Sequence, residues 1–214
     1  MILQTLVRNG HSRYKRSMRA KPRSVDAGRQ AEPARAAWNG GVKFFHWLIA
    51  LLILVQFALG WLAVSWRLSP TKLDLFVWHK SIGVLVLALV LLRLAWRLAA
   101  PPAPALPAHM PAWERIAARA SHVLLYVLML VLPLSGWVVQ STSGMPFRIF
   151  WQWPLPVIAA ADKAASDLAA IVHLSLGIAL AALLVVHIGA ALRHHFIQRD
   201  EVLTRMLPTR RRAS

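Results

Sequence analysis

Histidines inside apolar stretches are the main candidates for chemistry in this sequence. Six of the nine histidines lie within or at the ends of such stretches: His46, His79, His122, His173, His187 and His194. An imidazole is a common metal ligand and changes its protonation near neutral pH. The chain has no cysteine, so iron–sulfur clusters and thiolate-bound metals are excluded. A single buried histidine is often only hydrogen-bonded to a neighbouring helix. Six of them favour metal binding or proton transfer, because an unsatisfied buried polar group costs roughly 2–7 kcal/mol.

Four long apolar stretches must position these side chains. They cover about residues 44–64, 75–92, 116–139 and 168–192, with Pro133 inside the third. Each approaches or exceeds the roughly 20 apolar residues that cross a bilayer. The chain is 57% hydrophobic and 15% charged, whereas soluble domains are about 45–50% apolar and 25% charged. The first stretch is too long for a cleaved signal peptide, so we expect it to be a retained anchor. The sequence predicts an all-α integral membrane four-helix bundle.

The lysines and arginines predict how the bundle is oriented. Ten lie at or before position 43, four lie between positions 93 and 119, and six lie at or after position 193. The two loops on the opposite side carry only five. Because cytoplasmic segments are enriched in Lys and Arg, both termini are expected in the cytoplasm. This distribution explains the net charge of +17 better than nucleic-acid binding does, so no nucleic-acid partner is expected.

The regions outside the apolar stretches are predicted to be less ordered. Residues 1–37 are rich in Arg and Ala without periodicity and are expected to form a disordered basic cytoplasmic tail. Residues 38–208 are expected to form the transmembrane domain, and residues 209–214 a basic C-terminal tail. Residues 99–112 form a Pro-rich linker between the second and third stretches.

The depths of four histidines predict two pairs. His173 and His187 are 14 residues apart, which in a helix puts them about 40° apart in azimuth and about 21 Å apart along the axis. His79 begins the second stretch at the depth of His173, and His46 begins the first at the depth of His187. One pair is therefore expected near each side of the membrane.

Two facing imidazoles without thiolates or carboxylates suit haem b with axial His/His ligation. Structural zinc usually takes four ligands. Copper can take two histidines, but one pair per leaflet of a single bundle fits two stacked haems better. A porphyrin also needs space beside its ligand, and residues at i+4 share a helix face. The residue four positions after each paired histidine is small: Ala50, Gly83, Gly177 and Ala191.

Several short motifs occur in order along the chain. They are F-H-W at 45–47, H-K-S-I-G at 79–83, S-H-V-L-L-Y-V-L-M-L-V-L-P-L-S-G at 121–136, H-L-S-L-G at 173–177, H-I-G-A-A-L-R-H-H-F at 187–196 and Q-R-D-E-V-L-T-R-M-L-P at 198–208. As a set they resemble the bacterial cytochrome b561 family of four-helix dihaem membrane proteins, over about residues 38–208. Residues 1–37 fall outside the resemblance.

The resemblance implies a multi-pass protein of the bacterial inner (cytoplasmic) membrane with two haem b groups. It implies iron ligands at His46 and His187 on the cytoplasmic side and at His79 and His173 on the outer side. It also implies that His194 serves a quinone site, with ubiquinone as an exchangeable substrate; a role for His122 at that site stays open. One group of the family resembles a superoxide:ubiquinone oxidoreductase, and others are electron carriers.

The two groups of the family imply two alternative functions for this chain. The first is transfer of electrons from superoxide on the outer side to ubiquinone. The alternative is a haem b subunit that links a soluble dehydrogenase or reductase partner to the quinone pool. A structural scaffold without redox chemistry does not explain the histidines. The partners expected in either case are membrane lipid, quinone, and superoxide or a soluble redox protein.

Candidate residues for the reaction lie near the two sides of the membrane. Three outer cations are positioned to attract an anion such as superoxide, or are ordinary cations that reach lipid headgroups: Arg67, Lys72 and Lys80. At the cytoplasmic edge, His194 follows His187 by seven residues and is a candidate to donate a proton to quinone, or simply caps its helix. Acidic residues that could conduct protons to it are Asp200 and Glu201, and candidate partners of haem propionates are Arg93, Arg193 and Lys80.

Overall fold

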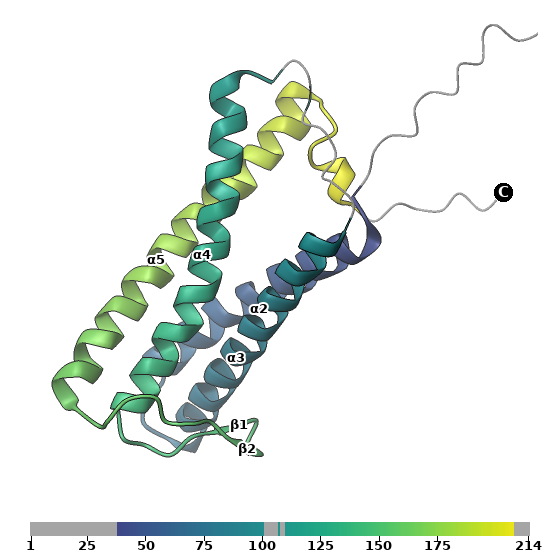
Figure 1. The fold of residues 1–214 in the computed structure, drawn as a ribbon. Helices are drawn as coiled ribbons and strands as arrows, with labels where there is room; N and C mark the ends of the chain where they lie inside the picture. Colours follow the sequence, from purple (N-terminus) through teal and green to yellow (C-terminus); the bar gives the residue numbers. More distant parts are fainter. Residues whose placement is uncertain (1–37, 101–106, 108–109, 208–214) are drawn as a thin grey trace, which may run out of the picture. The chain divides into compact units, whose positions relative to one another are not determined.

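Four long helices make up most of the computed structural model, which describes residues 38–100, 107 and 110–207. The predictions for the tails at 1–37 and 209–214, and for most of the Pro-rich linker, lie outside these residues. The helices are α2 (Gly40–Ser65), α3 (Pro70–Ala99), α4 (Ala112–Thr142) and α5 (Lys163–Arg193) (Figure 1). Each contains one predicted stretch and is long and apolar enough to cross a membrane. The all-α membrane bundle is therefore confirmed, while the side that each end faces stays a prediction.

The helices extend beyond the apolar stretches because polar residues cap their first turns. Asn39 accepts a hydrogen bond from the backbone N–H of Gly41 at 2.8 Å, and Ser69 accepts one from that of Lys72 at 3.3 Å. Asp162 caps α5 through the N–H of Ala165 at 2.7 Å. Such side chains satisfy backbone donors that have no partner inside the helix. The caps thus fix where α2, α3 and α5 begin.

The helices pack as two hairpins, α2 with α3 and α4 with α5, which meet mainly through α3 and α4 (Figure 1). A small apolar core joins all four helices: Ile49, Ile53, Val86, Val90, Leu125 and Leu180. Most other large apolar side chains point outward. An exposed apolar surface of this extent is expected where helices contact lipid.

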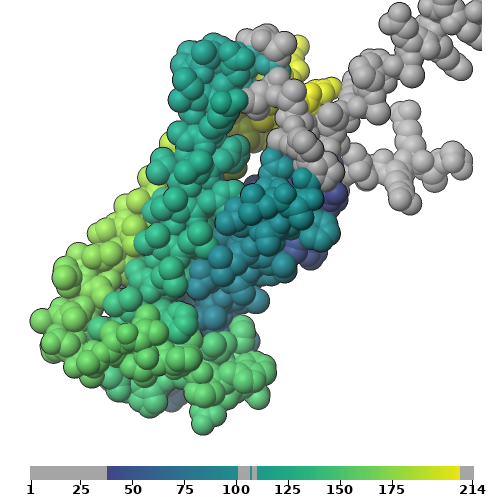
Figure 2. Space-filling view, in the orientation of Figure 1, coloured from purple at the N-terminus to yellow at the C-terminus, as the bar shows by residue number. Residues whose placement is uncertain are grey.

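The segment between α4 and α5 lies across one end of the helices, which we call the loop end (Figure 2). It contains two short antiparallel strands, β1 (Arg148–Ile149) and β2 (Trp153–Pro154). The backbone N–H of Phe150 donates to the buried hydroxyl of Ser81 at 2.8 Å. The Trp78 ring contacts the rings of Phe150 and Trp151 edge-on. These contacts hold the segment to α3, beside His79.

The opposite end, which we call the tail end, contains the start of α2 and the end of α5. After α5 the chain forms a π-helical turn η1 (His194–Gln198), reverses at Arg199 with a φ of 55°, and forms a 3₁₀ turn η2 (Thr204–Met206). This return segment, residues 199–207, reaches α2. The Lys43 ammonium donates to the carbonyl of Leu207 at 2.9 Å, and the Trp47 indole donates to that of Met206 at 3.0 Å.

Candidate functional site

At the loop end, the imidazoles of His79 on α3 and His173 on α5 face each other. Their ring centres are 6.2 Å apart and their planes are nearly perpendicular, at 87°. Both rings are only partly exposed. The structure therefore brings together the two histidines that the sequence places at the same depth.

At the tail end, His46 on α2 faces His187 on α5. Their ring centres are 6.4 Å apart, with an angle of 68° between the planes. A third imidazole joins them, because the ring of His122 on α4 lies 5.5 Å from that of His187. His187 thus contacts two other imidazoles at the tail end, whereas the loop end has a single pair.

The two pairs fit a haem iron bound between imidazoles. A metal–imidazole nitrogen bond is about 2 Å long and the ring centre lies about 1 Å behind the nitrogen, so two imidazoles on opposite sides of one metal have centres about 6 Å apart. The observed separations of 6.2 and 6.4 Å match this value. Moreover, α5 packs mainly on α4 rather than along α2 or α3. This leaves α5 apart from the two helices whose histidines face its own, as a porphyrin between the histidines requires. Among the described residues, no group of three or more His, Cys, Asp or Glu side chains is arranged to hold a bare metal ion.

Two glycines set the position of the loop-end rings. A Cβ atom at Gly60 on α2 would lie 3.1 Å from Cε1 of His79, and a Cβ atom at Gly136 on α4 would lie 3.1 Å from Cε1 of His173. Such a separation is tighter than ordinary van der Waals contact. Each ring therefore packs directly on the backbone of a neighbouring helix.

Neither glycine is among the site residues predicted from the sequence, although a repeated pattern marks both. His46 and His122 are each followed 14 positions later by Gly-Trp, at 60–61 and 136–137. His79 and His173 each begin a pattern His-x-Ser-x-Gly. The two hairpins therefore share one arrangement of His, Gly and Ser, and the structure gives both Gly–His contacts the same distances.

The three cations expected to attract an anion differ in their surroundings. Lys80 donates to the amide oxygen of Gln140 at 2.5 Å and lies over the rings of Phe76 and Phe147. Lys72 donates to the carbonyls of Val64 and Trp66 and so caps the end of α2. Arg67 is exposed. All three lie at the loop end, and only Lys80 is adjacent in sequence to a paired histidine.

At the tail end, His194 is buried and bound to an acidic residue. Its Nδ1 atom lies 2.5 Å from Oδ2 of Asp200, whose backbone N–H donates to the carbonyl of His194 at 3.1 Å. Glu201, the second acidic residue considered, lies 3.4 Å from the guanidinium of Arg205. The return segment thus orients the imidazole that sequence reasoning assigned to quinone.

The remaining cations predicted to meet haem propionates have protein partners. The Nε atom of Arg93 donates to the hydroxyl of Tyr126 at 3.0 Å. Arg193 donates to the carboxylate of Glu114 at 2.8 Å and thereby links α5 to the start of α4. These contacts hold both arginines at the tail end.

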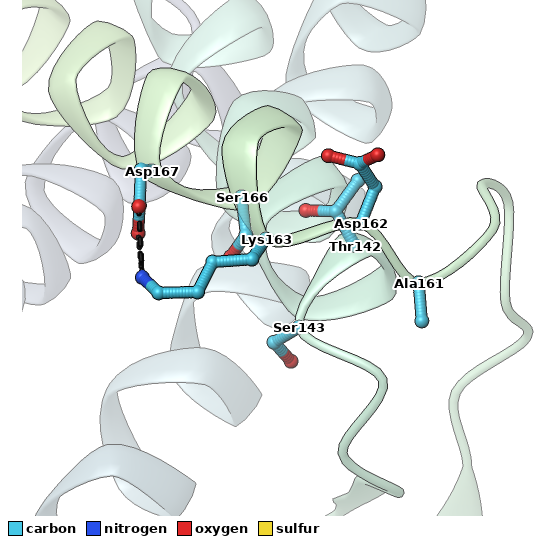
Figure 3. A pocket seen from close by; sticks show the side chains of 7 residues that line it. All are labelled: Thr142, Ser143, Ala161, Asp162, Lys163, Ser166 and Asp167. Carbon is cyan, nitrogen blue, oxygen red and sulfur yellow. Dashed lines mark hydrogen bonds and ion pairs between the residues drawn. The ribbon is translucent and has the colours of Figure 1, made fainter.

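A polar hollow at the junction of α4 and α5 lies apart from the histidines. Its lining includes Thr142, Asp162, Ser166 and the exposed ion pair of Lys163 with Asp167, at 2.8 Å (Figure 3). His173 follows Lys163 by ten residues, or about 15 Å along a helix. This hollow therefore does not belong to the imidazole pair at the loop end.

Comparison with known proteins identifies the family of the chain. The sequence model of the family described as prokaryotic cytochrome b561 matches residues 37–209. The chain belongs to this family. Its membership confirms the resemblance drawn from the motifs, and it makes the chain a multi-pass bacterial membrane protein that binds haem b.

Three curated relatives align with most of this cytochrome b561-family chain. "Cytochrome b561 homolog 2" of Escherichia coli (strain K12) is 36% identical over 169 residues, which cover 76% of this chain and 87% of the relative. "Cytochrome b561 homolog 1" of the same strain is 29% identical, covering 78% and 95%. "Probable superoxide oxidase CybB" of Yersinia pestis is 28% identical, covering 78% and 93%. The family match at residues 37–209 thus covers all four helices.

Proposed function

We propose that this cytochrome b561-family chain binds two haem b groups and transfers electrons from superoxide on the outer side of the inner membrane to ubiquinone. One observation carries the proposal: two imidazole pairs, each spaced to hold one iron, lie at opposite ends of the bundle. His173 and His187 belong to one helix and are about 21 Å apart along its axis. One pair is therefore expected near each side of the membrane.

The overall reaction balances with one-electron donors and a two-electron acceptor. Two superoxide anions each lose one electron and become dioxygen, while ubiquinone gains two electrons and two protons to become ubiquinol. His46 with His187, and His79 with His173, would each hold one haem b, which would supply one-electron oxidation and reduction. The chain's own task is then to hold the groups, attract the donor and deliver protons.

We assign attraction of the donor to the loop end, because the distribution of Lys and Arg predicts that this end faces outward. Lys80 adjoins His79, and Lys72 and Arg67 precede it in the same end of the bundle. A local excess of positive charge raises the encounter rate with a small anion and makes it sensitive to salt. The relative whose name reads "Probable superoxide oxidase CybB" supports this choice of donor.

Delivery of protons is assigned to His194. A His194→Ala variant should keep both haems but reduce ubiquinone at least about 10²-fold more slowly, the lower range for loss of a general acid or base. Reduction of a ubiquinone analogue by the pre-reduced protein measures this rate. His195→Ala is the matched control, because that ring packs on Phe196, and it should react at the wild-type rate. Loss of a haem from His194→Ala would show instead that His194 is an iron ligand.

The proposal as a whole is tested on the purified chain in detergent. We expect two haems per chain, a reduced spectrum on addition of superoxide, and ubiquinol formation when a ubiquinone analogue is present. A chain that is reduced only by a co-purifying soluble redox protein would instead support the carrier-subunit alternative. A chain that binds no haem would refute both.

A further inference from the structure

Helix α4 supplies none of the proposed iron ligands, yet it surrounds one of them. The Oγ atom of Ser135 lies 2.9 Å from Nδ1 of His173, and the carbonyl oxygen of Leu132 lies 3.2 Å from the same atom. Gly136 packs its backbone against the same ring, with Cε1 as the nearest atom. Three neighbouring residues of α4 therefore fix one imidazole of α5.

The positions of the protons in this cluster follow from the hydroxyl. Ser135 donates its own proton to the carbonyl of Leu132, at 2.7 Å. Toward His173 its oxygen can then only accept, and the Leu132 carbonyl can also only accept. Nδ1 of His173 must therefore carry a hydrogen. In a neutral imidazole this leaves Nε2 with a free lone pair, which is the form that binds a metal.

The equivalent histidine of the other hairpin lacks this hydroxyl. The repeat aligns Gly60 with Gly136 and so places Leu59 where α4 has Ser135. The His79 ring lies near the backbone of Gln56, which corresponds to Leu132. Among the described residues, however, its Nδ1 atom has no hydrogen bond of normal geometry. The two imidazoles of the loop-end pair are thus held to different degrees.

We propose that Ser135 is a positioning residue for the loop-end haem: its hydroxyl fixes His173 as the Nδ1–H tautomer and orients Nε2 toward the iron. This inference rests on the proposed function, because it assumes a haem between His79 and His173. A hydrogen bond from the far nitrogen also makes an imidazole a more basic ligand. Ser135 therefore strengthens haem binding and lowers the reduction potential at the loop end.

Haem release from the loaded protein tests the proposal. In Ser135→Ala, one of the two haems should transfer to an excess of a haem-free acceptor protein about 10-fold faster, the lower end of the effect of losing a hydrogen-bond partner of a metal ligand. The reduction potential of that haem should rise. Ser175→Ala is the matched control, because Ser175 is exposed and its hydroxyl donates to the carbonyl of Ile171 in its own helix, at 2.9 Å; it should leave both quantities unchanged.

An isosteric pair keeps the test decisive even if the alanine variant does not accumulate. Ser135→Thr retains the hydroxyl and should behave as the wild type. Ser135→Val has the shape of the threonine variant but no hydroxyl, and it should behave as Ser135→Ala. Equal release rates and potentials in the Thr and Val variants overturn the proposal and leave the dihaem function standing. A wild-type chain without haem overturns the proposed function and this inference together.

Discussion

Alanine in place of His173 or His79 should leave the purified chain with one haem instead of two. Each substitution removes one imidazole of the loop-end pair, whose ring centres are 6.2 Å apart, so a haem there would lose one of the two histidines that would hold it. The pair of His46 and His187 is untouched and should keep its haem. The ratio of extracted haem to protein measures the effect, and the reduced-minus-oxidised spectrum should lose one component.

His122→Ala is the control for this result. Its ring lies 5.5 Å from that of His187, but it lies outside the two pairs and should keep both haems. Unchanged haem content in both His79→Ala and His173→Ala would refute the assignment of the loop-end pair. Loss of a haem from His122→Ala would assign that residue to iron.

Valine in place of Gly136 should remove the loop-end haem as effectively as loss of the ligand itself. Even a Cβ atom there would lie 3.1 Å from Cε1 of His173, and valine adds two further methyl groups. The ring cannot move aside without breaking its contacts with Ser135 and Leu132. Such crowding typically destabilises a packed core by about 1–3 kcal/mol. Haem content and thermal unfolding measure the two effects.

Gly189→Val provides the comparison, because nothing lies within 4 Å of a Cβ atom at Gly189. It should keep both haems and unfold close to the wild-type temperature. Gly60→Val should behave like Gly136→Val but more mildly, since the His79 ring that it would displace is less firmly hydrogen-bonded. Wild-type haem content in Gly136→Val would contradict the close packing of His173 on α4.

Apolar length and helical periodicity were enough to predict the four helices and the facing histidines. A bilayer fixes the minimum span, and a rise of about 1.5 Å per residue converts sequence spacing into depth. His79 therefore meets His173, and His46 meets His187, as depth requires. Depth alone does not fix azimuth between helices, which is why the contact of His122 with His187 was not predicted.

The parts that were not predicted depend on contacts between neighbouring helices and on the turn that follows α5. Nothing in the sequence distinguishes Ser135 from other serines in apolar helices. Its contact with His173 depends on how α5 packs against α4. The bond between His194 and Asp200 depends on a π-helical turn and a left-handed residue at Arg199, neither of which follows from hydropathy. The repeat of His, Gly and Trp between the hairpins was visible in the sequence and would have pointed to Gly60 and Gly136.

The bond between Lys43 and Leu207 joins the first turn of the bundle to its last described residue. A short connecting peptide between residues 38 and 207 would therefore replace an existing contact with a covalent one. New termini opened in the linker between α3 and α4 would leave each hairpin whole and only exchange their order. Because each histidine pair joins one helix of each hairpin, circular permutation should preserve both pairs, and the order of the two hairpins along the chain does not determine which histidines meet.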